Sequence, residues 1–212
     1  MIALIKKDFK LNFAVKSSLI SMVMFVPLLL FITEINDIVR IFHFIVLSYG
    51  YILINIPFKY DVKDKSHLLI QSMPVRKRDI VISKYIFAII SYCIALAFSL
   101  LIFTALDLLN IGDSINLSFN DIKETFLAYI LISSINLPTQ FRLPPKLANI
   151  VNVFIYVFIT NHFVFIPNST TIANFLTNTI ANNDFLVLIV SMIIYLVSMI
   201  ISIYLYKTRD LY

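Results

Sequence analysis

The sequence predicts an all-α membrane protein that crosses the bilayer six times. Of its 212 residues 60% are hydrophobic and only 14% are charged, with a mean hydropathy of +0.91. A soluble domain carries about 25% charged residues. Its apolar stretches approach the ~20 residues that a helix needs to cross ~30 Å of hydrocarbon. Helices are expected because backbone polar groups in lipid must be satisfied within the segment. The six stretches are Ser17–Ile35, Ile41–Phe58, Tyr85–Leu106, Thr125–Phe141, Leu147–Ile166 and Phe185–Tyr206.

The distribution of positive charge predicts which side of the membrane each loop occupies. With the N-terminus in the cytosol, all 17 Lys and Arg residues fall in cytosolic segments except Arg40 and Lys123. Positive residues near helix ends stay on the cytosolic side. Both termini are therefore expected in the cytosol, and residues 1–212 are expected to form one transmembrane domain. The net charge of +5 follows from this pattern, so no nucleic-acid partner is expected.

Residues 1–16 precede the first apolar stretch and form a distinct segment. Apolar side chains recur at spacings of three and four from Ile2 through Ile5 and Phe9 to Phe13, and lysines occupy the other faces. This pattern predicts a basic amphipathic helix that lies along the inner membrane surface. A solvated basic N-terminus that only enforces topology is the alternative.

The segment Lys59–Lys84 is the largest predicted cytosolic loop. It is rich in charge, yet it contains the apolar patch Leu68-Leu69-Ile70, and Pro74 follows that patch. Such a patch can dock a soluble partner, or it can pack beneath the membrane surface. The residues alone leave both interpretations open.

Patterns typical of catalysis are missing from the chain. It has no His-Glu-x-x-His metalloprotease pattern and no Gly-x-Ser-x-Gly elbow, and its three histidines are isolated in sequence. Its two glycines, Gly50 and Gly112, cannot build a phosphate-binding loop. We therefore expect no metal site, no cofactor bound by this chain and no ATP hydrolysis by it.

The apolar stretches carry few groups that could couple transport to an ion gradient. They contain no Lys or Arg, and Glu34, at the outer end of the first stretch, is their one acidic residue. Ionisable groups near the bilayer centre typically mark ion pathways, so an ion-coupled carrier is disfavoured. Polar residues in lipid face neighbouring helices or a cavity. The candidates for lining a pathway, with helix–helix hydrogen bonding as the alternative, are Ser91, Ser99, Thr104, Ser133, Asn136 and Asn152.

Two short segments resemble a known family. The segment Gln71–Tyr85 reads Gln-Ser-Met-Pro-Val-Arg-Lys-Arg-Asp-Ile-Val-Ile-Ser-Lys-Tyr, and Asp61 precedes it. It resembles a Ser-Leu-Pro-Val-Ser-Arg-x-x-Ile-Val-x-x-Lys-Tyr pattern of ABC-2 type permeases, the membrane subunits of bacterial ABC exporters. A second segment, Pro138–Arg142, is similar to the Pro-x-x-Phe-Lys segment of that family, although Leu143 stands where the family has glycine.

The resemblance implies a function for the chain and a role for its largest loop. The chain would be the permease subunit of an ATP-driven exporter in the bacterial cell membrane, paired with a second copy or a paralogue. Separate ATPase subunits would bind ATP and magnesium. A cytosolic coupling helix between the second and third spans would dock on the ATPase through Lys65, Leu68, Leu69, Ile70, Met73, Pro74, Arg76 and Arg78.

The resemblance leaves the cargo and one alternative function open. Small permeases of this kind include exporters of phenol-soluble modulins, which are amphipathic toxin peptides. The expected substrate is therefore an amphipathic or hydrophobic compound such as a peptide. The alternative is a membrane anchor or regulator that transports nothing and recruits a cytosolic protein through the same loop.

Overall fold

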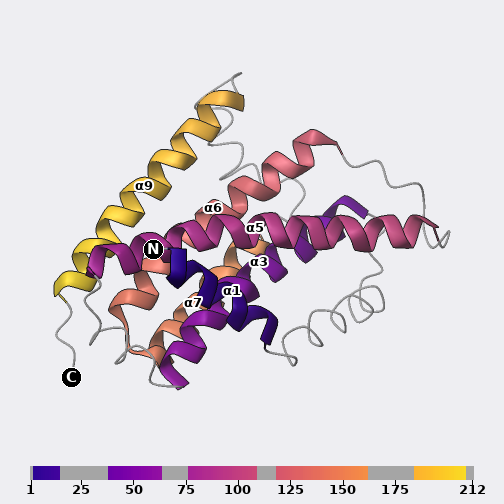
Figure 1. The fold of residues 1–212 in the computed structure, drawn as a ribbon. Coiled ribbons are helices and arrows are strands. Elements are labelled where there is room, and N and C mark those ends of the chain that lie inside the picture. Colours follow the sequence, from indigo (N-terminus) through magenta and orange to yellow (C-terminus); the bar gives the residue numbers. More distant parts are fainter. Residues whose placement is uncertain (1, 15–37, 64–75, 109–117, 162–183, 209–212) are drawn as a thin grey trace. The chain divides into compact units, whose positions relative to one another are not determined.

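The computed structural model describes residues 2–14, 38–63, 76–108, 118–161 and 184–208, and its regular elements in these ranges are α-helices (Figure 1). The all-α prediction is therefore confirmed. The helices are α1 (Ile2–Ala14), α3 (Ile38–Lys63), α5 (Lys77–Leu108), α6 (Phe119–Arg142), α7 (Pro145–Thr160) and α9 (Asp184–Thr208).

Three of the described helices are long and apolar enough to cross a membrane: α3 over Val39–Lys63, α5 over Lys77–Ala105 and α9 over Leu188–Thr208. They coincide with the second, third and sixth predicted spans. Helix α6 covers the fourth but begins with charged residues, and α7 is apolar but has 16 residues, about 24 Å of helix. The first predicted span, Ser17–Ile35, lies outside the described residues. The count of six spans therefore stays a prediction.

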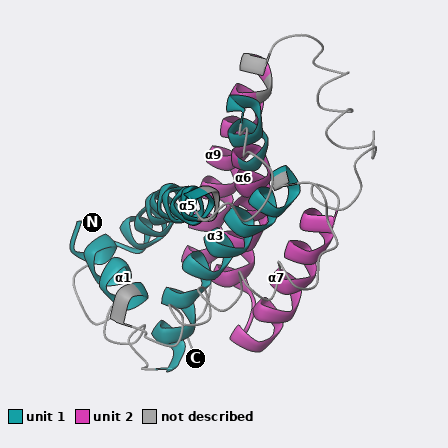
Figure 2. Ribbon diagram, turned by 90° about the vertical axis from the view of Figure 1, so that its right-hand side faces the viewer, with its two compact units in different colours: residues 1–125 teal, residues 126–212 magenta. Residues whose placement is uncertain are grey.

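The chain divides into two compact units, Met1–Thr125 and Phe126–Tyr212 (Figure 2). The expectation of one transmembrane domain over residues 1–212 stays a prediction. Each unit is described by itself below.

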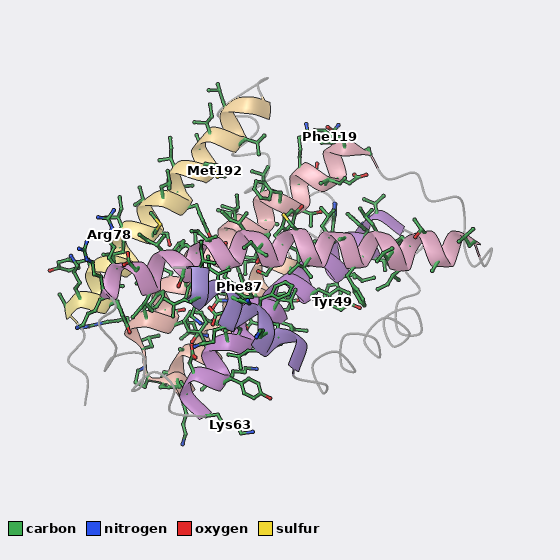
Figure 3. All side chains as sticks on the ribbon, in the orientation of Figure 1. Tyr49, Lys63, Arg78, Phe87, Phe119 and Met192 are labelled. Carbon is green, nitrogen blue, oxygen red and sulfur yellow. The ribbon has the colours of Figure 1, made fainter. Side chains whose placement is uncertain are left out.

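In the first unit, α1, α3 and α5 all contact one another. Aromatic side chains fill the space between α3 and α5, where Tyr49 and Phe87 are buried (Figure 3). The rings of Tyr49 and Phe98 meet edge to face with centroids 5.3 Å apart, and those of Phe42 and Phe103 do so at 5.6 Å. Edge-to-face pairs are a favoured arrangement because the positive ring edge meets the negative ring face.

Helix α1 confirms that the N-terminal segment is helical, but it packs differently from a soluble amphipathic helix. Ile2 and Phe9, from the predicted apolar stripe, are exposed, while the polar Asp8 and Asn12 are buried. Asp8 and Asn12 are four residues apart and therefore share one face of the helix. Helix α1 thus turns Asp8 and Asn12 toward the protein and exposes apolar residues together with Lys6 and Lys10. Its placement along the inner membrane surface stays a prediction.

In the second unit, a short turn joins α6 to α7. The amide of Leu143 donates to Thr139 O at 2.9 Å and ends α6, and the amide of Ala148 donates to Pro144 O at 2.9 Å and begins α7. Pro145 occupies the first turn of α7, where a missing N–H costs nothing. At the end of α9, the ring of Tyr206 meets Phe141 of α6 with centroids 5.3 Å apart. The outer side of α9 is apolar, with Met192 among its exposed residues (Figure 3).

Two of the helices contain a proline in their interior: Pro57 in α3 and Pro138 in α6. Proline has no N–H, so the carbonyl four residues earlier loses its helical partner. Those carbonyls belong to Leu53 and Ser134. Asn12 Nδ2 of α1 donates to Leu53 O at 3.2 Å, and Ser198 Oγ of α9 donates to Ser134 O at 2.5 Å. In each unit, a side chain from another helix therefore replaces the hydrogen bond that proline removes.

Candidate functional site

Four charged residues from three helices gather in the first unit, and we call them the ion cluster: Lys7 and Asp8 of α1, Asp61 of α3 and Lys84 of α5. Lys84 Nζ lies 2.9 Å from Asp8 Oδ1 and 3.0 Å from Asp61 Oδ2. Lys7 Nζ pairs with Asp61 Oδ1 and lies 3.8 Å from Asp8 Oδ1. Two cations and two anions therefore balance, and Lys84 joins all three helices.

Lys84 also has an apolar partner on α3. Its ammonium lies 4.8 Å from the ring centroid of Phe58, within the range of a cation–π contact. The long methylene stem of lysine lets its charged head reach this position while the stem remains among apolar side chains. Lys84 is therefore held by charge from two helices and by an aromatic face.

Burial makes this cluster different from a surface ion pair. The Asp8 side chain is 1% exposed and that of Lys84 is 7% exposed, whereas Lys7 is 31% exposed. Burial raises the pKa of the Asp8 carboxyl above its usual value, and the Lys84 and Lys7 ammonium groups oppose that rise. Removing one partner of a buried pair leaves an uncompensated charge, so such a cluster strongly specifies one arrangement of its helices.

The ion cluster stands at the base of the predicted coupling loop. Asp61 lies in the last turn of α3 and Lys84 lies near the start of α5, so their contact closes the loop between those helices. The predicted coupling residues Lys65, Leu68, Leu69, Ile70, Met73 and Pro74 lie outside the described residues. Arg76 and Arg78, at the start of α5, are exposed, and Figure 3 labels Arg78 there and Lys63 at the end of α3. Exposed cations at this position could pair with acidic groups of a partner.

The candidate pathway residues divide between the two units. On α5, Ser91 and Ser99 are buried and donate to their own helix, to Ala88 O and Leu96 O, while Thr104 is exposed. On α6 and α7, Ser133, Asn136 and Asn152 are all buried. Thr139 Oγ1 contacts Asn152 Oδ1 and lies 2.7 Å from Asn136 O, which places these three α6 and α7 residues together. Whether any of the six lines a pathway stays a prediction.

Metal-binding chemistry has no candidate in the described part of the chain. No group of three or more His, Cys, Asp or Glu side chains gathers there. The ion cluster itself contains two carboxylates, but two ammonium groups occupy the space that a cation would need. The site is therefore suited to holding helices together rather than to binding a metal.

The comparison with protein families identifies the chain. The sequence model for an ABC-2 family transporter protein matches residues 3–207. The chain belongs to the ABC-2 transporter family. No curated protein and no solved structure matches it significantly. The resemblance predicted from Gln71–Tyr85 is confirmed, and this ABC-2 protein is a membrane transport component whose family context implies an ABC ATPase partner.

Sequence reasoning missed two buried polar positions of the candidate site in this ABC-2 protein, Asp8 and Asn12. Both lie beside the apolar stripe of α1, where a polar residue is by default interpreted as solvent-exposed. An acid and an amide spaced four residues apart in a short basic segment are a usable signal, because they present one polar face. The structure shows that this face is buried against α3 and α5.

Proposed function

We propose that this chain is the permease subunit of an ATP-driven exporter in the bacterial cytoplasmic membrane, with both termini in the cytosol. A second copy or a paralogue completes the pathway, and separate ATPase subunits bind ATP and magnesium. The cargo is an amphipathic or hydrophobic compound such as a peptide. The observation that carries the proposal, beyond family membership, is the ion cluster at the base of the predicted coupling loop.

For movement of the ATPase to reach the membrane helices, the ends of the coupling loop must be held firmly where they join α3 and α5. A pushed loop would otherwise bend where it meets the membrane helices, and the movement of the ATPase would be lost. The contact between Asp61 and Lys84, at 3.0 Å, ties the two helices that flank the loop, and Asp8 ties α1 to the same lysine at 2.9 Å. In this proposal α1, α3 and α5 move as one body when the ATPase pushes the loop.

Docking on the ATPase uses the apolar patch. Leu68, Leu69 and Ile70 form a short apolar helix face that enters a groove on the ATPase, a common way for a helix to be recognised. Arg76 and Arg78, which are exposed, pair with acidic residues at the rim of the groove and set its register more than its affinity. Alternating closure and release of the ATPases then tilts the helices between inward-open and outward-open states.

The proposal is tested by co-purification and ATPase turnover. Tagged chain should pull down an ABC ATPase, and Leu69→Asp should abolish most of the substrate-stimulated turnover. Burying a carboxylate in an apolar groove costs at least about 2 kcal/mol, which lowers the docking constant roughly 30-fold or more. Leu108→Asp is the matched control, because Leu108 is exposed at the opposite end of α5.

Each outcome distinguishes the proposal from its alternative. Loss of turnover with Leu69→Asp and not with Leu108→Asp supports coupling through the loop. Stable binding of an ATPase without any stimulation by amphipathic peptides would favour the anchor or regulator instead. Failure to recover an ABC ATPase from membranes that contain the chain would reject the permease proposal.

A further inference from the structure

A neutral polar cluster lies inside the second unit, between α6 and α7. It consists of Asn136 and Thr139 of α6 and Asn152 of α7, and we call it the amide cluster. Thr139 Oγ1 lies 2.7 Å from Asn136 O and is within hydrogen-bond distance of Asn152 Oδ1. Asn136 and Thr139 are three residues apart and leave α6 on the same side. Thr139 therefore contacts the backbone of Asn136 and the side chain of Asn152.

Three polar atoms of this cluster have hydrogen-bonding capacity that other described residues do not use. They are Asn136 Nδ2, Asn136 Oδ1 and Asn152 Nδ2, and each is buried without a hydrogen-bond partner within the ranges that the structure describes. Both asparagines are 1% exposed. Buried polar groups are almost always paired, so an amide with both its donor and its acceptor unused requires an explanation. A ligand that supplies both partners is one.

The surroundings of the cluster decide the chemistry of that ligand. From Thr125 to Phe141 and from Leu147 to Thr160, the two helices carry no charged residue. Stable binding of an ion in an apolar interior needs an opposite charge. The residues next to the cluster offer none, so the ligand group must be neutral. It must also supply one acceptor and one donor to match Asn136.

We propose that the amide cluster binds an amide group of the transported molecule, either a peptide bond or a carboxamide. Asn136 Nδ2 donates to the carbonyl of that group, and Asn136 Oδ1 accepts from its N–H. Asn152 Nδ2 donates to a second carbonyl nearby, as a peptide provides. This assignment rests on the proposed function, because it names the chemical class of the exported substrate.

Access to the cluster is through the side on which Thr139 lies. Thr139 is only half-buried, unlike the two asparagines. The adjacent Pro138 removes one backbone hydrogen bond from α6, and helices bend most readily at such positions. A movement of α6 away from α7 at this point would open the asparagines to the substrate, and the return movement would enclose it.

The test measures binding of two small probes to the full chain in lipid nanodiscs, by saturation-transfer NMR. N-acetyl-leucinamide carries two amide groups, whereas methyl 2-acetoxy-4-methylpentanoate, an ester analogue of the same shape, has two carbonyls and no N–H. The parent protein should bind the amide more tightly. Asn136→Leu removes two neutral hydrogen bonds and should lower the affinity for the amide about tenfold, with little effect on the ester.

Two further variants keep the result interpretable. Asn152→Leu should weaken binding of the amide by a few-fold, which covers the case in which Asn136→Leu fails to fold. Ser191→Ala is the matched control, because Ser191 is buried in α9 and donates to its own helix at Leu188 O. It should leave the affinity for both probes unchanged.

Several results would overturn the proposal. Equal affinity for amide and ester, or unchanged affinity for the amide in both asparagine variants, would show that the cluster does not recognise an amide. A higher thermal midpoint in Asn136→Leu without a change in binding would assign the cluster to helix packing or to water. No ATPase takes part in this assay, so its failure is separate from failure of the proposed function.

Discussion

Helices α3 and α6 each contain a proline near their C-terminal end. In each, a side chain from another helix donates to the carbonyl that the proline leaves without its helical hydrogen bond. The carbonyl of Leu53 receives a hydrogen bond from Asn12 of α1, and that of Ser134 receives one from Ser198 of α9. A freed carbonyl in an apolar interior is costly, so a neighbouring helix must supply the donor. This side-chain hydrogen bond therefore fixes one helix against another at a defined residue.

The two substitute hydrogen bonds, from Asn12 and from Ser198, differ in the side chains that surround them. Next to Asn12, α1 carries Asp8, which belongs to the buried ion cluster. Next to Ser134, α6 carries Asn136 and Thr139, which are neutral. Charged groups fix geometry strongly because breaking them is costly, while neutral groups can exchange partners at lower cost. We therefore expect the first unit to resist rearrangement at this point more strongly than the second.

The largest expected effect tests the rigid side of the comparison. Lys84→Met leaves Asp8 and Asp61 without their shared cation. Breaking a buried ion pair on one side costs roughly 3–5 kcal/mol. We therefore expect a large loss of purified folded protein and a much lower thermal midpoint in detergent.

The control for Lys84→Met is Lys77→Met, which removes an exposed lysine from the start of the same helix. It should change the thermal midpoint little, because exposed charges contribute about 0–1 kcal/mol. Adding Asp8→Asn to Lys84→Met should recover part of the loss, since one of the two carboxylates that paired with Lys84 is then neutral. A Lys84→Met protein as stable as the parent would show that the ion cluster does not hold the three helices.

The next effect concerns the carbonyl of Leu53 in α3, which accepts a hydrogen bond from Asn12. Asn12→Leu leaves Leu53 O without its donor, and an unsatisfied buried acceptor costs about 1–3 kcal/mol. Pro57→Ala restores a backbone N–H at the position that bonds Leu53 O. The loss caused by Asn12→Leu should therefore be smaller in the Pro57→Ala background. A thermal midpoint measured for all four members of this cycle gives the coupling, and strictly additive losses would show that Asn12 does not replace the hydrogen bond that Pro57 removes.

Much of this architecture could be predicted from sequence because it follows from periodicity and composition. The apolar stretches at residues 41–58, 85–106 and 185–206 became membrane-length helices, and the N-terminal segment became α1. The sequence around Lys84 also indicated the family, since Lys84 lies in the segment Gln71–Tyr85 that carries the resemblance. Local patterns suffice for such features.

Long-range partners could not be predicted in the same way. Nothing in the spacing of Asp8 and Lys84, separated by 76 positions, indicates that they meet. The role of Asn12 depends on a proline far away in the sequence, and so does that of Ser198. A rule could have found candidates: a proline inside an apolar helix requires a donor from elsewhere, and polar residues on other helices are the available donors. Choosing among them requires the tertiary arrangement.

A smaller effect is expected at the hydrogen bond from Ser198 to the carbonyl of Ser134. Ser198→Ala removes the donor to Ser134 O, and such hydrogen bonds between membrane helices contribute about 0.6 kcal/mol on average and at most about 1.7. Pro138→Ala should make Ser198→Ala nearly neutral, because the backbone of α6 then bonds Ser134 O itself. Ser191→Ala on the same helix is the control. If Ser198→Ala costs as much as Asn12→Leu, the expected contrast between the two units is wrong.

The smallest expected effect is a pH dependence of the thermal midpoint, which the ion cluster of the first unit has and the neutral polar groups of the second unit lack. Because burial raises the pKa of Asp8, the folded protein binds a proton there more readily than the unfolded chain does. The resulting stability is complete below the unfolded pKa and is lost as pH rises through the higher folded pKa. As pH rises from the usual pKa of an aspartate, about 4, the thermal midpoint of the parent should therefore fall relative to that of Asp8→Asn. Asn136→Leu and Ser198→Ala replace groups that do not titrate, so their differences from the parent should stay constant with pH. A constant difference for Asp8→Asn as well would mean that the charge of this carboxylate is fully compensated by Lys84 and Lys7.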